Sequence, residues 1–117
     1  MSLVLEVCQY LRERPELDGV YVSNRMPNPA RTPAVIVGSS GGFAVNAAVD
    51  SWTIDVRSYA VEDLDADELA ATLRRVLDGM NTASIHDCWP VMLPVDSVDS
   101  TSGLPIRFAR YGVLLTS

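Results

Sequence analysis

SWTIDVRSYAVEDLDADELAATLRRVLDGM, residues 51–80, is the stretch that decides the fold, because a strand pattern is followed there directly by a helix pattern. At its start, apolar Trp52, Ile54 and Val56 alternate with polar residues. This period of two is typical of a strand with one buried and one solvated face. Further on, apolar residues recur as one helical stripe: Leu69, Leu73, Val76, Leu77 and Met80. The stretch therefore predicts a helix packed on a sheet.

The start of this helix is predicted at Asp65. Its carboxylate would accept the amide of Glu68, and Glu68 would bond back to the amide of Asp65, which completes a capping box. Leu64 and Leu69 stand where a hydrophobic staple would place them. Acidic residues at the start and arginines near the end complement the helix dipole. Gly79 would supply a left-handed exit.

Apolar patterns and chain breakers place the other elements. The segments predicted are a helix over residues 2–14, which Ser2 can cap and Pro15 stops, and strands over 20–26, 34–37, 91–98 and 104–115. The order is helix, three strands, helix, two strands. This order predicts an α+β fold with about five mostly antiparallel strands packed against two helices, in a single domain over residues 1–117.

Several connections are less regular. Residues 38–50 are small and weakly apolar, which predicts a long loop or a projecting β-hairpin with a functional role. Residues 81–90 are interpreted as a connector. Pro94 places its strand at a sheet edge or beside a bulge, and Gly112 is expected to mark another bulge.

Composition excludes several classes of function. The 117 residues are 48% hydrophobic, yet no apolar run approaches the about 18 residues of a membrane span. The first residues contain no cationic segment, so synthesis in the cytoplasm is expected. The net charge is −6, which argues against a general nucleic-acid binder. All nine basic residues are arginines, so phosphate-loop and Schiff-base lysines are excluded.

Three motifs resemble parts of ligand or catalytic sites, but each lacks residues that such a site needs. The acidic run at residues 63–67 imitates half of a calcium loop, but Glu68 and Arg74 occupy the positions that need Gly and Glu. The glycine-rich segment 38–42 has no phosphate lysine. His86 and Cys88 provide two soft ligands where zinc needs three or four. No catalytic residue, metal or cofactor is predicted.

The two cysteines are far apart in sequence. Cys8 lies on the predicted core face of the first helix, and Cys88 follows His86 in the predicted connector. In a cytoplasmic protein, two buried free thiols are favoured over a disulfide.

Charged side chains also lie within the predicted strands. Asp55 and Arg57 share the polar side of one strand, and Arg107 and Arg110 lie on the last strand. Such groups, where no helix covers them, form either solvated cross-strand pairs or a surface that faces another subunit.

This organisation resembles the small tail-terminator (tail-completion) proteins of long-tailed bacteriophages and related head–tail joining proteins. The matching features are the first helix ending at Pro15, the strand at residues 34–37, the strand at 52–59, the acidic-capped helix at 64–80, and a final pair of strands. The resemblance covers nearly all of the chain and is one of length, pattern and order.

The resemblance implies a non-enzymatic virion protein at the head-proximal end of the tail. It would form a ring with itself, commonly a hexamer, on the last ring of the tail tube protein. There it would stop polymerisation and join the tail to the head–tail connector protein. DNA would pass through an acidic lumen without specific binding, and no membrane is involved.

Two alternatives remain open. One is a head-closure, connector or minor tail protein, and the other is a small cytoplasmic α+β enzyme or ligand-binding domain that uses His86 and Cys88. If the protein is a structural virion protein, the candidate subunit-interface residues are Ser40, Gly41, Gly42, Phe43, Val45, Asp55, Arg57, Arg107 and Arg110.

Overall fold

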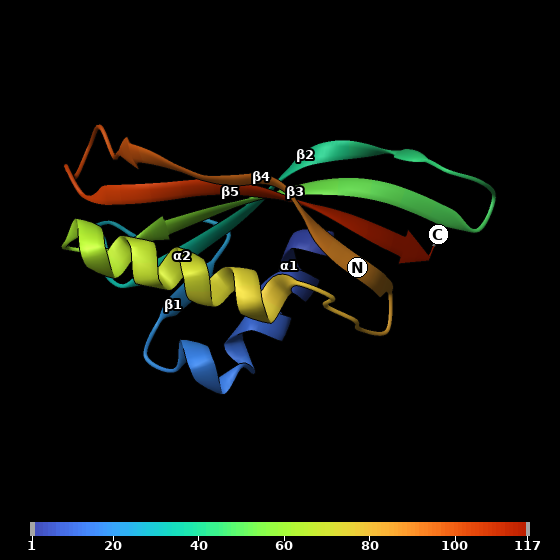
Figure 1. The fold of residues 1–117 in the computed structure, drawn as a ribbon, viewed down its shortest axis with the longest axis horizontal. Helices are drawn as coiled ribbons and strands as arrows, with labels where there is room; N and C mark the ends of the chain where they lie inside the picture. The colour runs from blue at the N-terminus through green and yellow to red at the C-terminus, as the bar shows by residue number, and fades with distance from the viewer. Residues whose placement is uncertain (1, 117) are drawn as a thin grey trace.

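Two helices cover one face of a five-stranded sheet (Figure 1). The structure is a computed structural model that describes residues 2–116. In chain order its elements are α1 (Leu3–Arg12), the 3-10 helix η1 (Pro15–Leu17), β1 (Tyr21–Ser23), β2 (Ala34–Ala44), β3 (Val49–Tyr59), α2 (Asp63–Leu77), β4 (Ile85–Val98) and β5 (Pro105–Thr116). The predicted α+β class and element order are confirmed.

The sheet has the strand order β1-β2-β3-β5-β4. Only β1 and β2 are parallel, and the other neighbours are antiparallel. β3 lies in the middle of this order. It pairs with β5 without a register shift, from Val49↔Thr116 to Tyr59↔Ile106. The two edges are unequal, because β1 has 3 residues and β4 has 14. β1 is shorter than the predicted segment 20–26, because the pairing with β2 covers Tyr21, Val22 and Ser23 and ends there.

The main core lies between the sheet and the helices. Val7, Cys8 and Leu11 of α1 are fully buried, and Ser2 caps that helix as predicted by accepting the Leu5 amide at 3.5 Å. The remaining buried members come mainly from α2 and the inward faces of β2, β3, β4 and β5, including Val35, Val37, Ile54, Val56, Leu73, Leu77, Met80, Ile85, Tyr111 and Val113. Each buried aliphatic side chain contributes roughly 1.5–3 kcal/mol.

A smaller apolar cluster lies on the opposite face of the sheet. It contains Ala34, Ile36, Tyr59 and Ile106. Residues 34–37 are thus buried on both faces, as their continuous apolar run predicts. We call the face of this cluster the open face, because no helix covers it (Figure 1).

The predicted start of α2 is wrong. The helix begins at Asp63 with Glu62 as its N-cap residue, and no side chain caps it. Asp65 is therefore inside the first turn, there is no capping box, and the expected staple residue Leu64 is 69% exposed. The reason is a tertiary contact, because Arg107 of β5 binds Asp63 and holds the first turn from outside the helix. The predicted left-handed exit at Gly79 is confirmed by its φ of +72°.

Three further predictions concern the C-terminal hairpin. Residues 85–90 belong to β4 and are not a connector. Gly112 marks no bulge, because β3 and β5 stay in register through it and Trp89 pairs with it from β4. Gly112 instead makes room for the Trp89 ring, since a Cβ there would lie 2.4–2.5 Å from ring atoms. The prediction for Pro94 is confirmed, because β4 is an edge strand with a register shift between Met92 and Val95.

Candidate subunit interface

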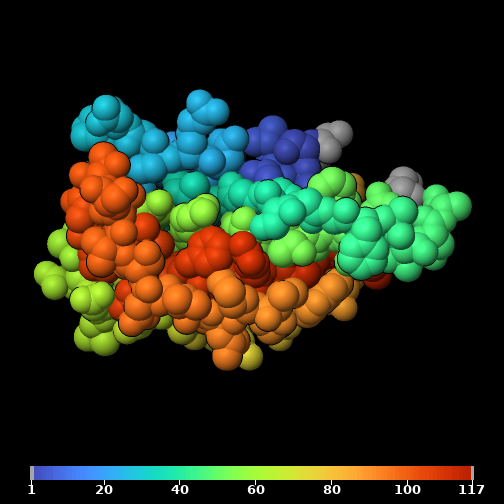
Figure 2. All heavy atoms as spheres, turned by 90° about the horizontal axis from the view of Figure 1, so that it is seen from above, coloured from blue at the N-terminus to red at the C-terminus, as the bar shows by residue number. Residues whose placement is uncertain are grey.

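The β2–β3 hairpin extends beyond the helices as an arm, defined here as residues 38–50 (Figures 1 and 2). Of the two predictions for this segment, the projecting hairpin is the one observed. Its turn is closed by the Val45 amide, which donates to the Val49 carbonyl at 2.9 Å. Near the tip, Phe43 is 69% exposed and Val45 is 53% exposed. The arm is ordered by its ladder and leaves two large apolar side chains in solvent.

Two glycines lie at a β-bulge in the arm. The register of β2 against β3 shifts between Ser39 and Gly41, and Gly41 has a φ of +97°. At Gly42 a Cβ would lie 2.3 Å from the Ser51 carbonyl oxygen and 2.8 Å from the Trp52 ring. Both glycines are therefore required by backbone geometry at a bulge, and this explains the glycine-rich segment without a phosphate ligand.

The predicted charged residues of β3 and β5 meet on the open face at the base of the arm. Arg110 Nε lies 2.9 Å from Asp55 Oδ1. Ser40 Oγ donates to the two oxygens of the same carboxylate at 2.7 and 2.6 Å. The guanidinium groups of Arg57 and Arg110 stack on the Phe108 ring, at 4.9 and 5.3 Å from its centroid. The result is a partly exposed polar cluster beside the arm.

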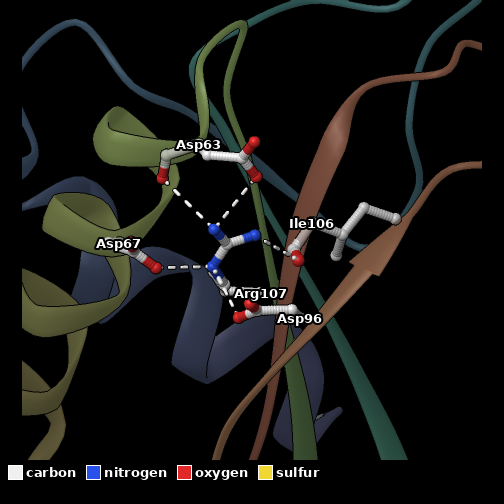
Figure 3. Close-up of polar contacts among 5 residues, drawn as sticks. All are labelled: Asp63, Asp67, Asp96, Ile106 and Arg107. Carbon is white, nitrogen blue, oxygen red and sulfur yellow. Dashed lines mark hydrogen bonds and ion pairs between the residues drawn. The ribbon is translucent and has the colours of Figure 1, made fainter.

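Arg107, the other charged candidate on β5, does not join this cluster, because it lies on the opposite face of the sheet from Arg110. Its side chain is 4% exposed and points to the start of α2 (Figure 3). Nε lies 2.6 Å from an Asp67 oxygen and 3.0 Å from an Asp96 oxygen, and Nη2 lies 3.1 Å from an Asp63 oxygen. The Asp67 hydrogen bond raises the pKa of Arg107. This cation is internally satisfied and fixes α2 to β5 and β4.

The second half of β4 carries a surface that sequence reasoning did not include among the candidates. Val91, Leu93, Val95 and Val98 are each at least 50% exposed. They lie on the outermost strand, which forms the lower border in Figure 2. The available signal was the uncharged run from Val91 to Val95 in a strand already assigned to an edge.

The two halves of this edge differ in how their backbone is satisfied. The loop after α2 covers the first half: the amides of Gly79 and Thr82 donate to the carbonyls of Cys88 and Ile85, both at 2.9 Å. For residues 91–98, no hydrogen bond from outside the sheet is found among residues 2–116. The edge is therefore closed at its start and open from Val91 onward.

His86 and Cys88 do not form a reactive pair. Both lie on β4, where His86 is exposed and its Nε2 hydrogen-bonds with Thr116 Oγ1. Cys88 is buried on the helix side, and burial raises the pKa of its thiol to about 12, with Asp87 and Asp78 adding to the rise. A thiol held in its protonated form is a poor nucleophile and a poor metal ligand. Cys8 is likewise free and buried, as predicted.

Neither a cluster of metal ligands nor a membrane-spanning helix is found among the described residues. Among residues 2–116, no three His, Cys, Asp or Glu side chains are placed to hold a metal ion. Within that same range, no helix has the length and apolar character needed to cross a bilayer. A hollow of about 540 Å³ lies beneath the base of the arm, where Glu6, Asp50 and Trp52 are among its lining residues, but neither His86 nor Cys88 reaches it.

Comparison with known proteins identifies a shared fold. No protein-family model matches the chain. Among solved structures, a chain described as "Virion of native gene transfer agent (GTA) particle" is similar over its full length, with a TM-score of 0.63 and 16% sequence identity. The alignment covers 100% of each chain. At this identity the likeness establishes the fold that the two chains have in common.

Proposed function

We propose that this protein is a structural component of a phage-like virion that forms a ring on the end of a tail tube. The ring stops tube polymerisation and presents a surface to the head–tail connector. The observation that carries the proposal is the full-length likeness to a chain of a gene transfer agent virion, with neither chain left uncovered. The pattern of helices and strands that resembles tail-terminator proteins supports the same assignment.

The shape of the molecule supports assembly by self-association. The described residues extend 44 × 26 × 24 Å, with the arm at one end of the long axis (Figure 1). An arm that leaves Phe43 69% exposed gains stability when a neighbour covers that ring. The arm and its receiving surface are different parts of the chain, which makes the contact heterologous. A heterologous contact closes into a ring when the rotation between neighbouring subunits closes, as the proposed ring requires. A homo-hexamer is the ring size that the family resemblance implies.

Charge supports passage of DNA without capture. The chain carries −6 net charge, and two of its arginines form ion pairs within the fold. Arg107 binds aspartates of α2 and β4, and Arg110 binds Asp55. An acidic ring would repel the phosphate backbone and let DNA slide through its lumen. The same arrangement supports a role without catalysis, since the His86 and Cys88 pair is not assembled for chemistry.

The test is to add the purified protein to polymerising tail tube subunits and to measure tube lengths by electron microscopy. We expect shorter tubes, each with an extra ring of density at one end only. Tubes of unchanged length with bare ends would contradict the proposal. Binding of the protein to isolated connector rings, with no effect on tubes, would instead support a head-closure role. Virion purification followed by immunolabelling would then locate the protein at the head-proximal end of the tail.

A further inference from the structure

Most of the large apolar side chains that solvent reaches lie in two places. Phe43 and Val45 are at the tip of the arm, and four more are on the open half of β4: Val91, Leu93, Val95 and Val98. The arm projects from one end of the sheet, whereas β4 ends at the opposite end (Figure 1). One copy therefore cannot place its arm on its own β4 edge, and a contact between these surfaces requires two molecules.

Charge favours a second copy as the occupant of both surfaces. Two chains of net charge −6 repel each other, so a self-contact is best made by neutral segments. Residues 38–49 contain no charged side chain, and neither do residues 88–95. Edge strands that remain unpartnered are commonly protected by charged residues. The absence of charge along 88–95 is what a strand with a protein partner requires.

The backbone of β4 limits the kind of contact that forms. Pro90 and Pro94 lack amide donors, and the register shifts on either side of Met92 interrupt a regular ladder. A long intermolecular sheet is therefore disfavoured. Packing of apolar side chains from the arm against those of the edge is the contact that remains.

We propose that the arm tip of one copy docks on the outer edge of β4, residues 91–98, of the next copy. This docking rests on the proposed ring and specifies its subunit contact. Each molecule gives its arm to one neighbour and receives an arm from the other, so the contact propagates in one direction around the ring. Phe43 and Val45 bury against Val91, Leu93 and Val95, and these apolar side chains leave solvent together.

Cross-linking tests the pairing directly. Val45→Cys and Leu93→Cys are combined in one chain and treated with a short bismaleimide at the highest concentration at which the protein stays in solution. The native thiols of Cys8 and Cys88 should not react with the cross-linker, since both are buried and burial raises the pKa of each. The matched control combines Val45→Cys with Leu5→Cys, because Leu5 is 52% exposed on α1 and Leu93 is 56% exposed on β4.

A heterologous contact predicts a ladder of dimers, trimers and larger species that ends at the ring size. Val45→Cys alone and Leu93→Cys alone each have one reactive thiol, so cross-linking of either variant can go no further than dimers. We expect trimers and larger species from Val45→Cys/Leu93→Cys at ten-fold or more above the Leu5 control. Equal ladders from the two double variants would overturn the docking.

The outcome is separable from that of the proposed function. If the parent protein caps tubes but the double variant gives no ladder, then the arm–edge contact is wrong and the capping role stands. If the ladder forms but the parent never caps tubes, then the contact is right and the capping role is wrong.

Discussion

Arg107 and Arg110 lie on the same strand but on opposite faces of the sheet, and their surroundings differ. Arg107 is 4% exposed and contacts three aspartates from α2 and β4. Arg110 is 44% exposed, pairs with Asp55, and stacks over Phe108. The helix-covered face uses its arginine to hold elements of one chain together. The open face presents its arginine at the surface, beside the arm. On the proposed function, the comparison separates a residue that stabilises the fold from one that is available for assembly.

The largest effect is expected at Arg107. Replacing it with Ala removes several partly buried charge-assisted hydrogen bonds and a packed aliphatic stem, and we expect a loss of about 2–3 kcal/mol in the free energy of unfolding. Arg107→Met keeps the stem and should recover about half of this loss, on the same reasoning. Urea denaturation measures both. The comparison fails if Arg107→Ala costs no more than Arg110→Ala.

A second effect is expected where Trp89 of β4 lies over Gly112 of β5. Gly112→Ala places a methyl group 2.4–2.5 Å from atoms of the Trp89 ring, which must move. We expect a loss of about 1–2 kcal/mol, within the usual cost of overpacking, together with a changed Trp fluorescence. Gly38→Ala is the matched control, because nothing lies within 4 Å of its Cβ position. Equal stability of the two variants would show that the ring does not depend on Gly112.

A smaller effect is expected on the open face. Arg110→Ala should change the free energy of unfolding by about 0.2–1 kcal/mol, because partly exposed ion pairs contribute little. High salt should reduce the difference between parent and variant further. Thermal denaturation at two ionic strengths measures both quantities. A loss as large as that at Arg107 would mean that the open face is structural.

The smallest effect is expected at Asp65. This residue lies inside the first turn of α2 and is not its cap, so Asp65→Ala should cost about 0.5 kcal/mol or less. Asp67→Ala should cost more, because Asp67 accepts a 2.6 Å hydrogen bond from Arg107. Calorimetry of the two variants compares them. If Asp65→Ala is the more damaging of the two, the corrected helix start is wrong.

The elements were predictable where local patterns and tertiary contacts agree. The alternation at Trp52, Ile54 and Val56 identified β3, and the apolar stripe identified α2, although its last member, Met80, lies beyond the end of the helix at Leu77. The start of α2 was not predictable, because Arg107, which holds the first turn, is far away in sequence. Local capping rules pointed to Asp65 instead. The helix began where a distant side chain supports it.

The candidate interface was predictable in part for a similar reason. Small, weakly apolar residues with exposed Phe43 and Val45 indicated a projecting segment. The alternation of side chains along β5 puts Arg107 on the opposite face from Phe108, but the sequence does not reveal which of the two faces α2 covers. The exposed half of β4 depends on strand order, since only its place at the edge leaves Leu93 in solvent.

The division between a stable body and an assembling arm is tested most directly by tube length in the presence of a Phe43→Ser/Val45→Ser variant. Its free energy of unfolding should stay within about 0.5 kcal/mol of the parent, because both side chains are exposed. The matched control is Val61→Ser/Leu64→Ser, which removes an equally exposed apolar pair near the start of α2. The account predicts short, capped tubes with the parent and the control, and long, uncapped tubes with the arm variant. Capping by the arm variant at the parent's level would contradict it.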